Sequence, residues 1–180
     1  VVSFFGDGAT DEGVFYESLN FAALKQLPIV FVCGNNLYAI HTHLLSRHKA
    51  ADLCGRIRVF GIPAEQIADN NVFEINKRVQ AAVCVLRAGE AGPFFFECLT
   101  YRWKEHVGPN DDFHLGYRRF EEARPWIEGD EVKRVGTLIA AESRERIEAQ
   151  VDEEIQTAFQ CAEKDAFPEA RELLTDVSGD

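Results

Sequence analysis

Two apolar runs near the start of the chain each end in a glycine followed by short polar residues. Val1 to Phe5 runs into Gly6-Asp7-Gly8, and Ile29 to Cys33 runs into Gly34-Asn35-Asn36. The residues between the runs have a helical apolar pattern, so the whole stretch has the length of one strand–helix–strand unit. Parallel strands end at the same edge of a sheet, where open α/β sheets bind ligands. We therefore expect Asp7 and Asn36 to lie side by side at a ligand-binding edge.

The side chains at these strand ends favour a hard cation together with an anion. Carboxylate and amide oxygens suit Mg²⁺, which takes a few protein ligands beside water and substrate phosphates. Gly6 and Gly8 allow the backbone to approach a ligand closely, and the helix after them offers free N–H groups to an anion. Gly-Asp-Gly alone is common in turns. Its position 29 residues before Asn36, with each half at a strand end, makes the signal specific.

These residues resemble the thiamine-diphosphate signature, Gly-Asp-Gly followed one such unit later by Asn-Asn. The wider stretches, Gly6 to Gly13 and Asn35 to Ile40, resemble the alpha subunit of the decarboxylase component of 2-oxo-acid dehydrogenases. That family includes the pyruvate, branched-chain and acetoin dehydrogenases. The resemblance covers nearly all 180 residues, as the C-terminal half of such a subunit. It implies the thiamine-diphosphate-binding fold: α/β, a mostly parallel sheet with flanking helices, and a helical C-terminal extension.

The resemblance also implies a ligand set for Mg²⁺ and for the cofactor, thiamine diphosphate. The metal would be bound by Asp7, the side-chain oxygen of Asn36 and the backbone carbonyl of Tyr38. Gly8 and Ala9 would supply backbone contacts to the cofactor diphosphate. Asp7 and Asn36 would bind the cofactor indirectly, because the metal that they hold contacts the diphosphate.

A second part of the resemblance is the loop after Thr100-Tyr101-Arg102. In the family a histidine of this loop reaches the cofactor diphosphate, and His106 falls on that catalytic and cofactor-binding position. An ordinary loop histidine is the alternative. Val107 stands where mitochondrial members have a phosphorylatable serine, so phosphorylation at this position is excluded. We expect the neighbouring pair Asp111-Asp112 to lie in a solvated loop.

The implied activity is oxidative decarboxylation of a small 2-oxo acid, or conversion of acetoin, with acyl transfer to lipoamide. The implied partners are a beta subunit, in a heterotetramer, and a lipoyl acyltransferase. The beta subunit would provide the glutamate that activates the aminopyrimidine, and the first half of an alpha subunit would precede Val1. The chain has no methionine and begins inside a strand, so we expect a fragment or processed product that is inactive alone. The alternative is a truncated, non-catalytic module for assembly or cofactor binding.

Composition narrows the classes of partner. The formal net charge is −11, and most of the acidic excess lies in residues 121–180, which gives no basic footprint for nucleic acid. No apolar run approaches the roughly 20 residues that span a membrane. The five cysteines show no C-x-x-C pair and indicate reduced, mostly buried thiols. We expect a cytoplasmic protein in a bacterium, or one of the mitochondrial matrix in a eukaryote.

The pattern predicts two regions of one domain: a diphosphate- and metal-binding α/β region over 1–125 and a helical C-terminal extension over 126–180. Beyond the first two strands, the expected elements are a helix over Val14–Ala23, a short strand at Val59–Ile62, a helix capped by Asn71, and a strand at Phe94–Leu99. Residues 37–57 show no clean period and predict a long loop with a helical turn. Its histidines are more typical of a loop than of a metal site, and they are His41, His43 and His48.

Overall fold

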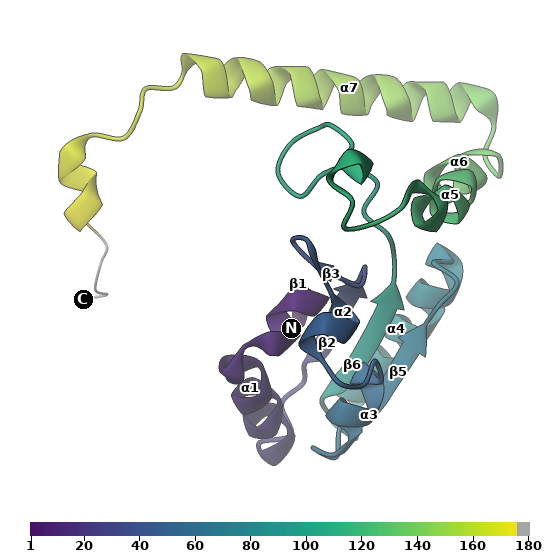
Figure 1. The fold of residues 1–180 in the computed structure, drawn as a ribbon, viewed down its shortest axis with the longest axis vertical. Coiled ribbons are helices and arrows are strands. Elements are labelled where there is room, and N and C mark those ends of the chain that lie inside the picture. The colour runs from purple at the N-terminus through teal and green to yellow at the C-terminus, as the bar shows by residue number, and fades with distance from the viewer. Residues whose placement is uncertain (176–180) are drawn as a thin grey trace. The chain divides into compact units, whose positions relative to one another are not determined.

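The structure is a computed structural model that describes residues 1–175. The chain falls into two compact units, Val1–Glu131 and the residues from Val132 onward, and each is described by itself. Figure 1 labels the elements of both units. The division of a single domain at residue 125 stays a prediction.

The first unit is built on a four-stranded sheet in which all neighbouring strands are parallel (Figure 1). The strand order is β1 (Val2–Gly6), β2 (Val30–Asn35), β6 (Phe94–Leu99) and β5 (Ala64–Ile67). This sheet confirms the α/β class. It also confirms the predicted strand at Phe94–Leu99.

The two central strands are the ones that the sequence marks most clearly. β2 and β6 have neighbours on both sides, and their nearly continuous apolar sequences match burial on both faces of the sheet. The edge strand was misplaced, because Val59–Ile62 is not a strand. Val59 ends a helix and Ile62 is a buried core residue, whereas β5 has the polar sequence Ala-Glu-Gln-Ile. Its two polar side chains, Glu65 and Gln66, are exposed, so this edge strand has no apolar run.

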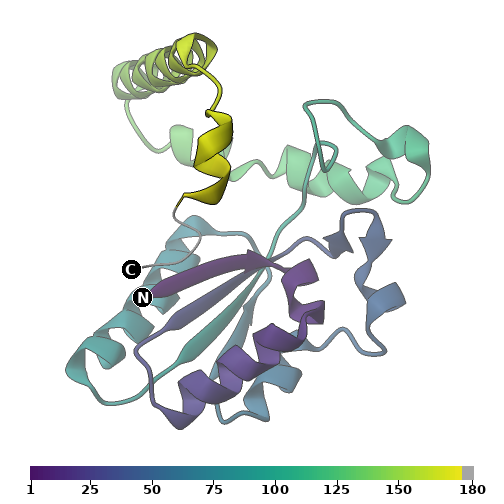
Figure 2. The ribbon, with the colours of Figure 1, turned by 90° about the vertical axis from the view of Figure 1, so that its left-hand side faces the viewer.

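Helices cover both faces of the sheet (Figure 2). On one face, α1 (Gly13–Leu24) and α3 (Leu53–Arg58) pack through Leu19 and Ile57, both fully buried, onto Phe31 and Phe95. On the other face, α4 (Val72–Ala88) packs onto Val30 and Phe96. These two layers form the core of the first unit.

The predicted cap of α4 is confirmed. The Asn71 side-chain oxygen accepts from the backbone N–H of Phe73 at 3.0 Å and of Glu74 at 3.4 Å. The backbone N–H of Asn71 itself donates to the Asp69 carboxylate at 3.3 Å. Asp69 therefore occupies the role that a full capping box would give to Glu74.

Residues 37–58 are more ordered than the predicted long loop. An antiparallel hairpin of β3 (Tyr38–Ala39) and β4 (Thr42–His43) leads directly into α2 (Leu44–Arg47), and α3 follows. The His43 Nδ1 atom caps α2 by accepting from the Leu45 N–H at 3.2 Å. The hairpin and the short helix return the chain toward the start of the sequence, which brings Arg47 to Asp7.

The remaining elements are helical. In the first unit, the 3₁₀ turns η1 (Asp7–Asp11) and η2 (Phe113–Leu115) precede α5 (Phe120–Glu128) in chain order. α6 (Glu131–Gly136) spans the boundary between the units, and the second unit contains α7 (Ala141–Lys164) and η3 (Ala170–Leu174). This confirms the predicted helical C-terminal part over the described residues; the last five of the predicted region, 176–180, lie outside them. Within residues 1–175, every helix is too short or too polar to cross a membrane.

Candidate functional site

The predicted site residues meet at the carboxyl edge of the sheet. β1 pairs with β2 in a register that aligns Gly6 with Gly34, so Asp7 and Asn35 follow at the same level. β6 ends beside them, because the Thr100 N–H donates to the Asn35 carbonyl at 3.0 Å. Figure 2 shows the strands running to this edge.

Asp7 is a buried carboxylate at the end of β1, with 1% of its surface exposed. It opens η1, and the hydroxyl of Thr10 donates to the Asp7 carbonyl at 2.7 Å, which closes the turn. Its carboxylate accepts a hydrogen bond from the Arg47 guanidinium. The same guanidinium donates to Asp11 at 2.6 Å and to the Thr42 carbonyl at 3.2 Å. Arg47 therefore neutralises the charge that would attract a cation to Asp7.

Asp11 gathers a second set of positive charges beside Asp7. Its Oδ1 atom lies 2.5 Å from His48 Nε2, and its Oδ2 atom accepts from Arg47. Burial acts to raise the pKa of the Asp11 carboxyl, but the hydrogen bonds and charges of Arg47 and His48 prevail and lower it. Asp11 is thus held as a carboxylate partner for Arg47.

The two asparagines after β2 shape the backbone of the neighbouring loop. Asn35 accepts from the Leu37 N–H at 2.9 Å, and Asn36 accepts from the Tyr38 N–H at 3.0 Å, both through side-chain oxygens. Leu37 has a φ of 70°, a left-handed conformation that is uncommon outside glycine and asparagine. The two side chains therefore hold a strained bend at the residues that carry the predicted oxygen ligands.

Gly8 lies where η1 and the hairpin approach each other. A Cβ atom built on Gly8 would lie 3.0 Å from the Cβ of Ala39, closer than ordinary contact distance. Ala9, the next residue, is exposed. The close backbone approach gives a physical reason for glycine at position 8, independent of any ligand.

The donor set at this edge has the chemistry of a Mg²⁺ site. A carboxylate from Asp7, an amide oxygen from Asn36 and a backbone carbonyl at Tyr38 are all hard oxygen donors. The Asn36 oxygen has a second lone pair beyond the one used by Tyr38. Among residues 1–175, no three His, Cys, Asp or Glu side chains gather as a metal cluster, so a cation here would rely on amide and carbonyl oxygens. The residues fit the group once Arg47 releases Asp7.

His106 lies in the loop that follows β6 and is exposed. In the part of the chain that the structure describes, its side chain forms no hydrogen bond or ion pair. Asp7 and Gly8 follow the end of β1, Asn36 and Tyr38 follow the end of the neighbouring strand β2, and the two segments approach each other at Gly8 and Ala39. The proximity of His106 to the site stays a prediction.

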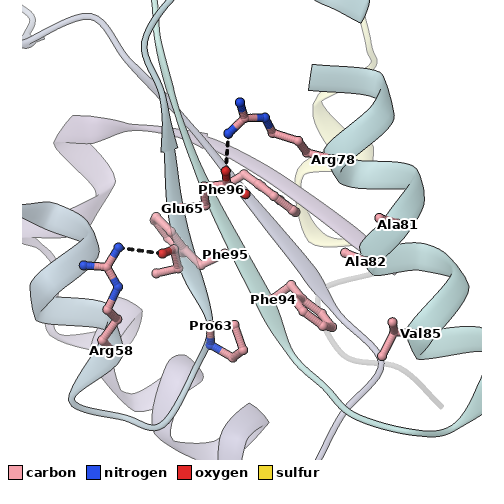
Figure 3. Close-up of a pocket in the computed structure, with 11 residues that line it drawn as sticks. Arg58, Pro63, Glu65, Arg78, Ala81, Ala82, Val85, Phe94, Phe95 and Phe96 are labelled. Carbon is pink, nitrogen blue, oxygen red and sulfur yellow. Dashed lines mark hydrogen bonds and ion pairs between the residues drawn. The ribbon is translucent and has the colours of Figure 1, made fainter. Parts of the chain in front are cut away.

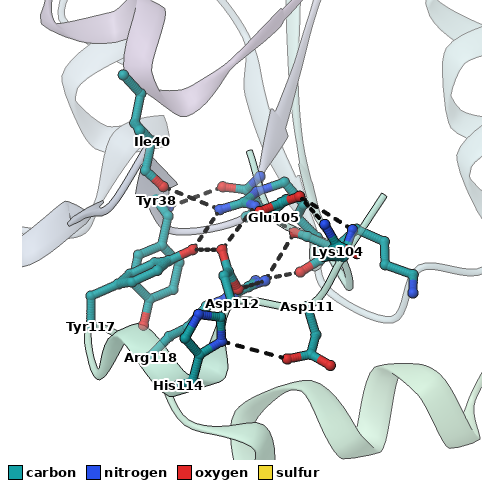
Figure 4. Close-up of polar contacts among 12 residues, drawn as sticks. Tyr38, Ile40, Lys104, Glu105, Asp111, Asp112, His114, Tyr117 and Arg118 are labelled. Carbon is teal, nitrogen blue, oxygen red and sulfur yellow. Dashed lines mark hydrogen bonds and ion pairs between the residues drawn. The ribbon is translucent and has the colours of Figure 1, made fainter. Parts of the chain in front are cut away.

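The loop around His106 is fastened by a buried polar cluster (Figure 4). Asp112 is completely buried, contrary to the solvated position expected for it, whereas Asp111 is exposed. The Arg118 guanidinium donates to Asp112 at 2.8 Å and to the Lys104 carbonyl at 2.9 Å, and the Tyr117 hydroxyl also donates to Asp112. The local sequence, a pair of aspartates in a polar loop, gives no signal of this burial.

The cluster also ties the loop to the hairpin. Arg102 donates to the Ile40 carbonyl at 3.1 Å and to the Tyr117 hydroxyl at 2.9 Å. Burial acts to raise the pKa of Asp112, but hydrogen bonds from Tyr117 and Arg118 prevail and lower it. Burial and a hydrogen bond to the Glu122 carboxylate raise the pKa of Tyr38. Hydrogen bonds thus connect the loop to the β3–β4 hairpin.

The three histidines His41, His43 and His48 have separate roles. His43 caps α2, as described above, and His41 packs on the Tyr117 ring with centroids 4.5 Å apart. The Nδ1 atom of His48 lies 2.9 Å from the Arg56 guanidinium. Their different partners agree with the interpretation of loop histidines.

A separate pocket of about 610 Å³ lies between α4 and the first residues of β5 and β6 (Figure 3). Its walls are mainly apolar, with Phe94, Phe95 and Phe96 of β6 on one side and Ala82 and Val85 of α4 on the other. It is lined by the beginnings of these strands, whereas Asp7 and Asn36 follow strand ends. The pocket is not part of the candidate site.

Comparison with known proteins decides the family. The family model described as "Dehydrogenase E1 component" matches residues 1–171. The chain belongs to this dehydrogenase E1 component family. The matched residues include the parallel sheet and both strand ends, Gly-Asp-Gly and Asn-Asn.

Three relatives illustrate the match. The chain is 32% identical over 182 residues to pyruvate dehydrogenase E1 component subunit alpha-3, chloroplastic, of Arabidopsis thaliana, covering 99% of this chain and 42% of the relative. It is 30% identical to pyruvate dehydrogenase E1 component subunit alpha of Rhizobium meliloti, covering 98% and 51%. It is 31% identical to the acetoin:2,6-dichlorophenolindophenol oxidoreductase alpha subunit of Bacillus subtilis, covering 98% and 53%. The chain spans about half the length of these relatives.

Sequence reasoning missed two residues at the site. Arg47 contacts Asp7, 40 positions away in sequence, and Glu97 contacts Asn35, 62 positions away. Arg47 lay in a stretch without a clear period. Glu97 did carry a signal, because it is a carboxylate inside an otherwise apolar strand, where a buried charge needs partners.

Proposed function

We propose that the chain forms the Mg²⁺- and diphosphate-binding wall of a thiamine-diphosphate-dependent 2-oxo-acid or acetoin dehydrogenase, as part of its alpha subunit. The observation that supports this most directly is the buried Asp7 carboxylate at the end of β1, next to the end of β2, which Asn36 follows. Membership of the dehydrogenase E1 component family supports the same conclusion. Pyruvate, branched-chain 2-oxo acids and acetoin all remain candidate substrates.

In this proposal each residue of the wall has a binding task. Asp7, the Asn36 side-chain oxygen and the Tyr38 carbonyl would hold Mg²⁺, and the backbone of Gly8 and Ala9 would contact the diphosphate. When bound, thiamine diphosphate supplies the electron sink for loss of CO₂ from the substrate. The protein's task at this wall is to fix the position of the anionic end of the cofactor. Arg47 must release Asp7 for the cation to bind.

The loop after β6 would complete the wall from the other side. His106 would donate to a diphosphate oxygen, and its exposed position leaves the side chain available for this contact. The cluster around Asp112 would hold the loop in place. Arg102, which belongs to this cluster, donates to the Ile40 carbonyl and would thereby connect the loop to the hairpin. A beta subunit would add the remaining wall, and a lipoyl acyltransferase would accept the acyl group. We propose the compartment of such a complex, the cytoplasm of a bacterium or the mitochondrial matrix of a eukaryote.

One observation favours the alternative of a non-catalytic module. The Arg47 guanidinium occupies the Asp7 carboxylate, as it would at a site that no longer takes a cation. Such a chain would keep the fold and serve in assembly or in cofactor binding only. A module that serves only in assembly differs from the main proposal in whether Mg²⁺ and the cofactor bind.

A thermal-shift experiment separates them. The midpoint of unfolding is measured with Mg²⁺, with thiamine diphosphate, and with both, for the chain alone and co-expressed with a beta subunit of a relative. A ligand at about 100 times its Kd stabilises the folded state by about 2.7 kcal/mol, which corresponds to roughly 5 to 10 °C in a chain of this size. We expect this shift only when both ligands are present.

Asp7→Ala should abolish the shift, because it removes the charged ligand. Asp111→Ala is the matched control, since it removes an exposed carboxylate of the same size. A shift that survives Asp7→Ala would contradict the proposed site. The absence of any shift in the wild type, even with the beta subunit, would favour the non-catalytic module.

A further inference from the structure

The central strand β6 carries a carboxyl group in the middle of the sheet. Glu97 has 1% of its surface exposed, and the strand register aligns it with Cys33 on β2 and Gln66 on β5. Removing a carboxylate from water is costly unless hydrogen bonds compensate. An apolar residue at this position would avoid the free-energy cost of burying a carboxylate, so the presence of Glu97 needs a specific explanation.

The contacts of Glu97 identify that task. One oxygen, Oε1, accepts from the side-chain amide of Asn35 at 2.6 Å. The other, Oε2, accepts from the Gln66 amide at 2.9 Å and from the Cys54 thiol at 3.4 Å. Only the first contact leads toward the candidate site, because Asn35 is the last residue of β2.

The contact with Glu97 fixes which way the Asn35 amide faces. With its nitrogen donating to Glu97, the Asn35 oxygen must face the opposite side, where it accepts from the Leu37 N–H at 2.9 Å. An amide turned by 180° would set its oxygen against the carboxylate and lose both bonds. The carboxylate of Glu97 therefore determines the partner of the Leu37 N–H.

The Leu37 bond matters because the backbone is strained there. Leu37 has a φ of 70°, and such a conformation persists only where the surroundings hold it. It separates the side chain of Asn36 from the carbonyl of Tyr38, the two neighbouring oxygens of the proposed metal site. A change at Leu37 would alter the direction of both.

We propose that Glu97 is a positioning residue of the cofactor site, which acts through Asn35 and Leu37 to aim the oxygens of Asn36 and Tyr38. The inference rests on the proposed function, since it assigns the metal to those oxygens. Glu97 itself does not touch the metal or the cofactor. Its role resembles that of other outer residues that orient metal ligands, whose loss commonly weakens metal binding 10- to 100-fold.

The experiment uses the full chain with thiamine diphosphate, under the conditions in which the wild type shows its thermal shift. Mn²⁺ replaces Mg²⁺, so that binding is followed by electron paramagnetic resonance. Glu97→Ala should weaken Mn²⁺ binding roughly 10- to 100-fold. Gln66→Ala is the matched control, because it removes a hydrogen bond to the other oxygen of Glu97 and leaves Asn35 in place. Its Mn²⁺ affinity should be unchanged.

A second readout needs no ligand. Hydrogen exchange of the Leu37 amide, followed by NMR, should be faster in Glu97→Ala than in the wild type and unchanged in Gln66→Ala. A role confined to general stability would speed exchange across β2 and β6 together. Selective loss of protection at Leu37 supports positioning.

A reciprocal pair of variants covers the case in which Glu97→Ala fails to fold. Asn35→Asp places a carboxylate against Glu97 and should weaken Mn²⁺ binding. Adding Glu97→Gln places an amide donor at position 97 opposite the new carboxylate at position 35. This double variant should recover both the protection of the Leu37 amide and the affinity for Mn²⁺. A double variant that folds without recovering either would overturn the inference, as would a folded Glu97→Ala protein with wild-type Mn²⁺ affinity. A wild type that binds no Mn²⁺ refutes the proposed function instead, and Leu37 exchange then still decides whether Glu97 holds the loop.

Discussion

The side chains of Asp112 and Arg118 form an ion pair inside the loop that follows β6, and water reaches almost none of it. Nε of Arg118 lies 2.8 Å from Oδ1 of Asp112, and 1% and 0% of the two side chains are exposed. A buried charge that loses its partner remains in a medium that solvates it poorly. We therefore expect Asp112→Ala to destabilise the protein by about 3 to 5 kcal/mol. Asp111→Ala should change stability by less than about 0.5 kcal/mol. Urea unfolding of both variants checks this, and equal effects would contradict it.

The same pair predicts a dependence of stability on acid. The pKa of Asp112 is below its ordinary value of 3.8 in the folded protein. A depressed pKa contributes stability that is complete above the unfolded value and is lost as the pH falls through the folded value. The advantage of the wild type over Asp112→Asn should therefore be constant near neutral pH and shrink below about pH 3.8. Unfolding free energies measured across this range test it, and an advantage that grows in acid would contradict it.

Arg47→Ala should strengthen the binding of Mg²⁺ in the absence of cofactor. The guanidinium both occupies the Asp7 carboxylate and repels an approaching cation, so its removal leaves the carboxylate open. We expect a gain of at least roughly five-fold, about 1 kcal/mol, because the ion pair that the cation must displace is largely buried. Calorimetric titration measures it. Arg58→Ala is the control, since Arg58 donates to the Ala64 carbonyl on the edge strand. Weaker binding by Arg47→Ala would show that Arg47 assists the cation rather than competing with it.

Gly8→Ala should destabilise the fold and be rescued by a second change. The added Cβ would lie 3.0 Å from the Ala39 Cβ, and such overpacking costs about 1 to 3 kcal/mol. Ala39→Gly removes the opposing atom, so the double variant should recover most of this loss. Gly13→Ala is a control because no atom lies within 4 Å of its added Cβ. Thermal unfolding of the single and double variants tests the contact, and a double variant no better than Gly8→Ala would exclude it.

The five cysteines should differ in how quickly their thiols react with a thiol reagent. Burial raises the pKa of Cys33, raises that of Cys54 to about 12, and raises that of Cys98, which suppresses the reactive thiolate. Cys84 and Cys161 are exposed. A thiol reagent that gives a coloured product should therefore react quickly with two thiols in the native protein and with all five after unfolding. Fast reaction of Cys33 in the native state would contradict its burial.

The sequence was most informative where local pattern and burial coincide. β2 and β6 lie in the middle of a parallel sheet, so their apolar runs could be recognised without knowledge of their neighbours. The Asn71 cap depends on residues within three positions of it, and it was predicted for the same reason. The edge strand β5 was missed because its polar side chains face solvent and resemble those of a loop.

The candidate site was predictable only in part. Asp7 and Asn36 could be placed because parallel strand ends share an edge. The residues that contact them could not be placed, because Arg47 reaches Asp7 from beyond a hairpin and Glu97 reaches Asn35 from the neighbouring strand β6, far along the chain. Asp112 was misjudged because its burial depends on Arg118 and Tyr117, which a polar loop sequence does not reveal. Contacts of this kind are a property of the folded chain.

The bond between Asn35 and Glu97 makes the bend at Leu37 depend on a distant segment of the chain. Its two residues are 62 positions apart, and pairing such distant segments carries a loop-closure cost that nearby segments avoid. β1, α1 and β2 can associate early, because they are consecutive in the chain. The bend at Leu37 acquires its anchor only when β6 joins β2. During synthesis the Gly-Asp-Gly and Asn-Asn segments are made before β6, so the site that we propose for them is complete only after the last strand of the sheet has joined it.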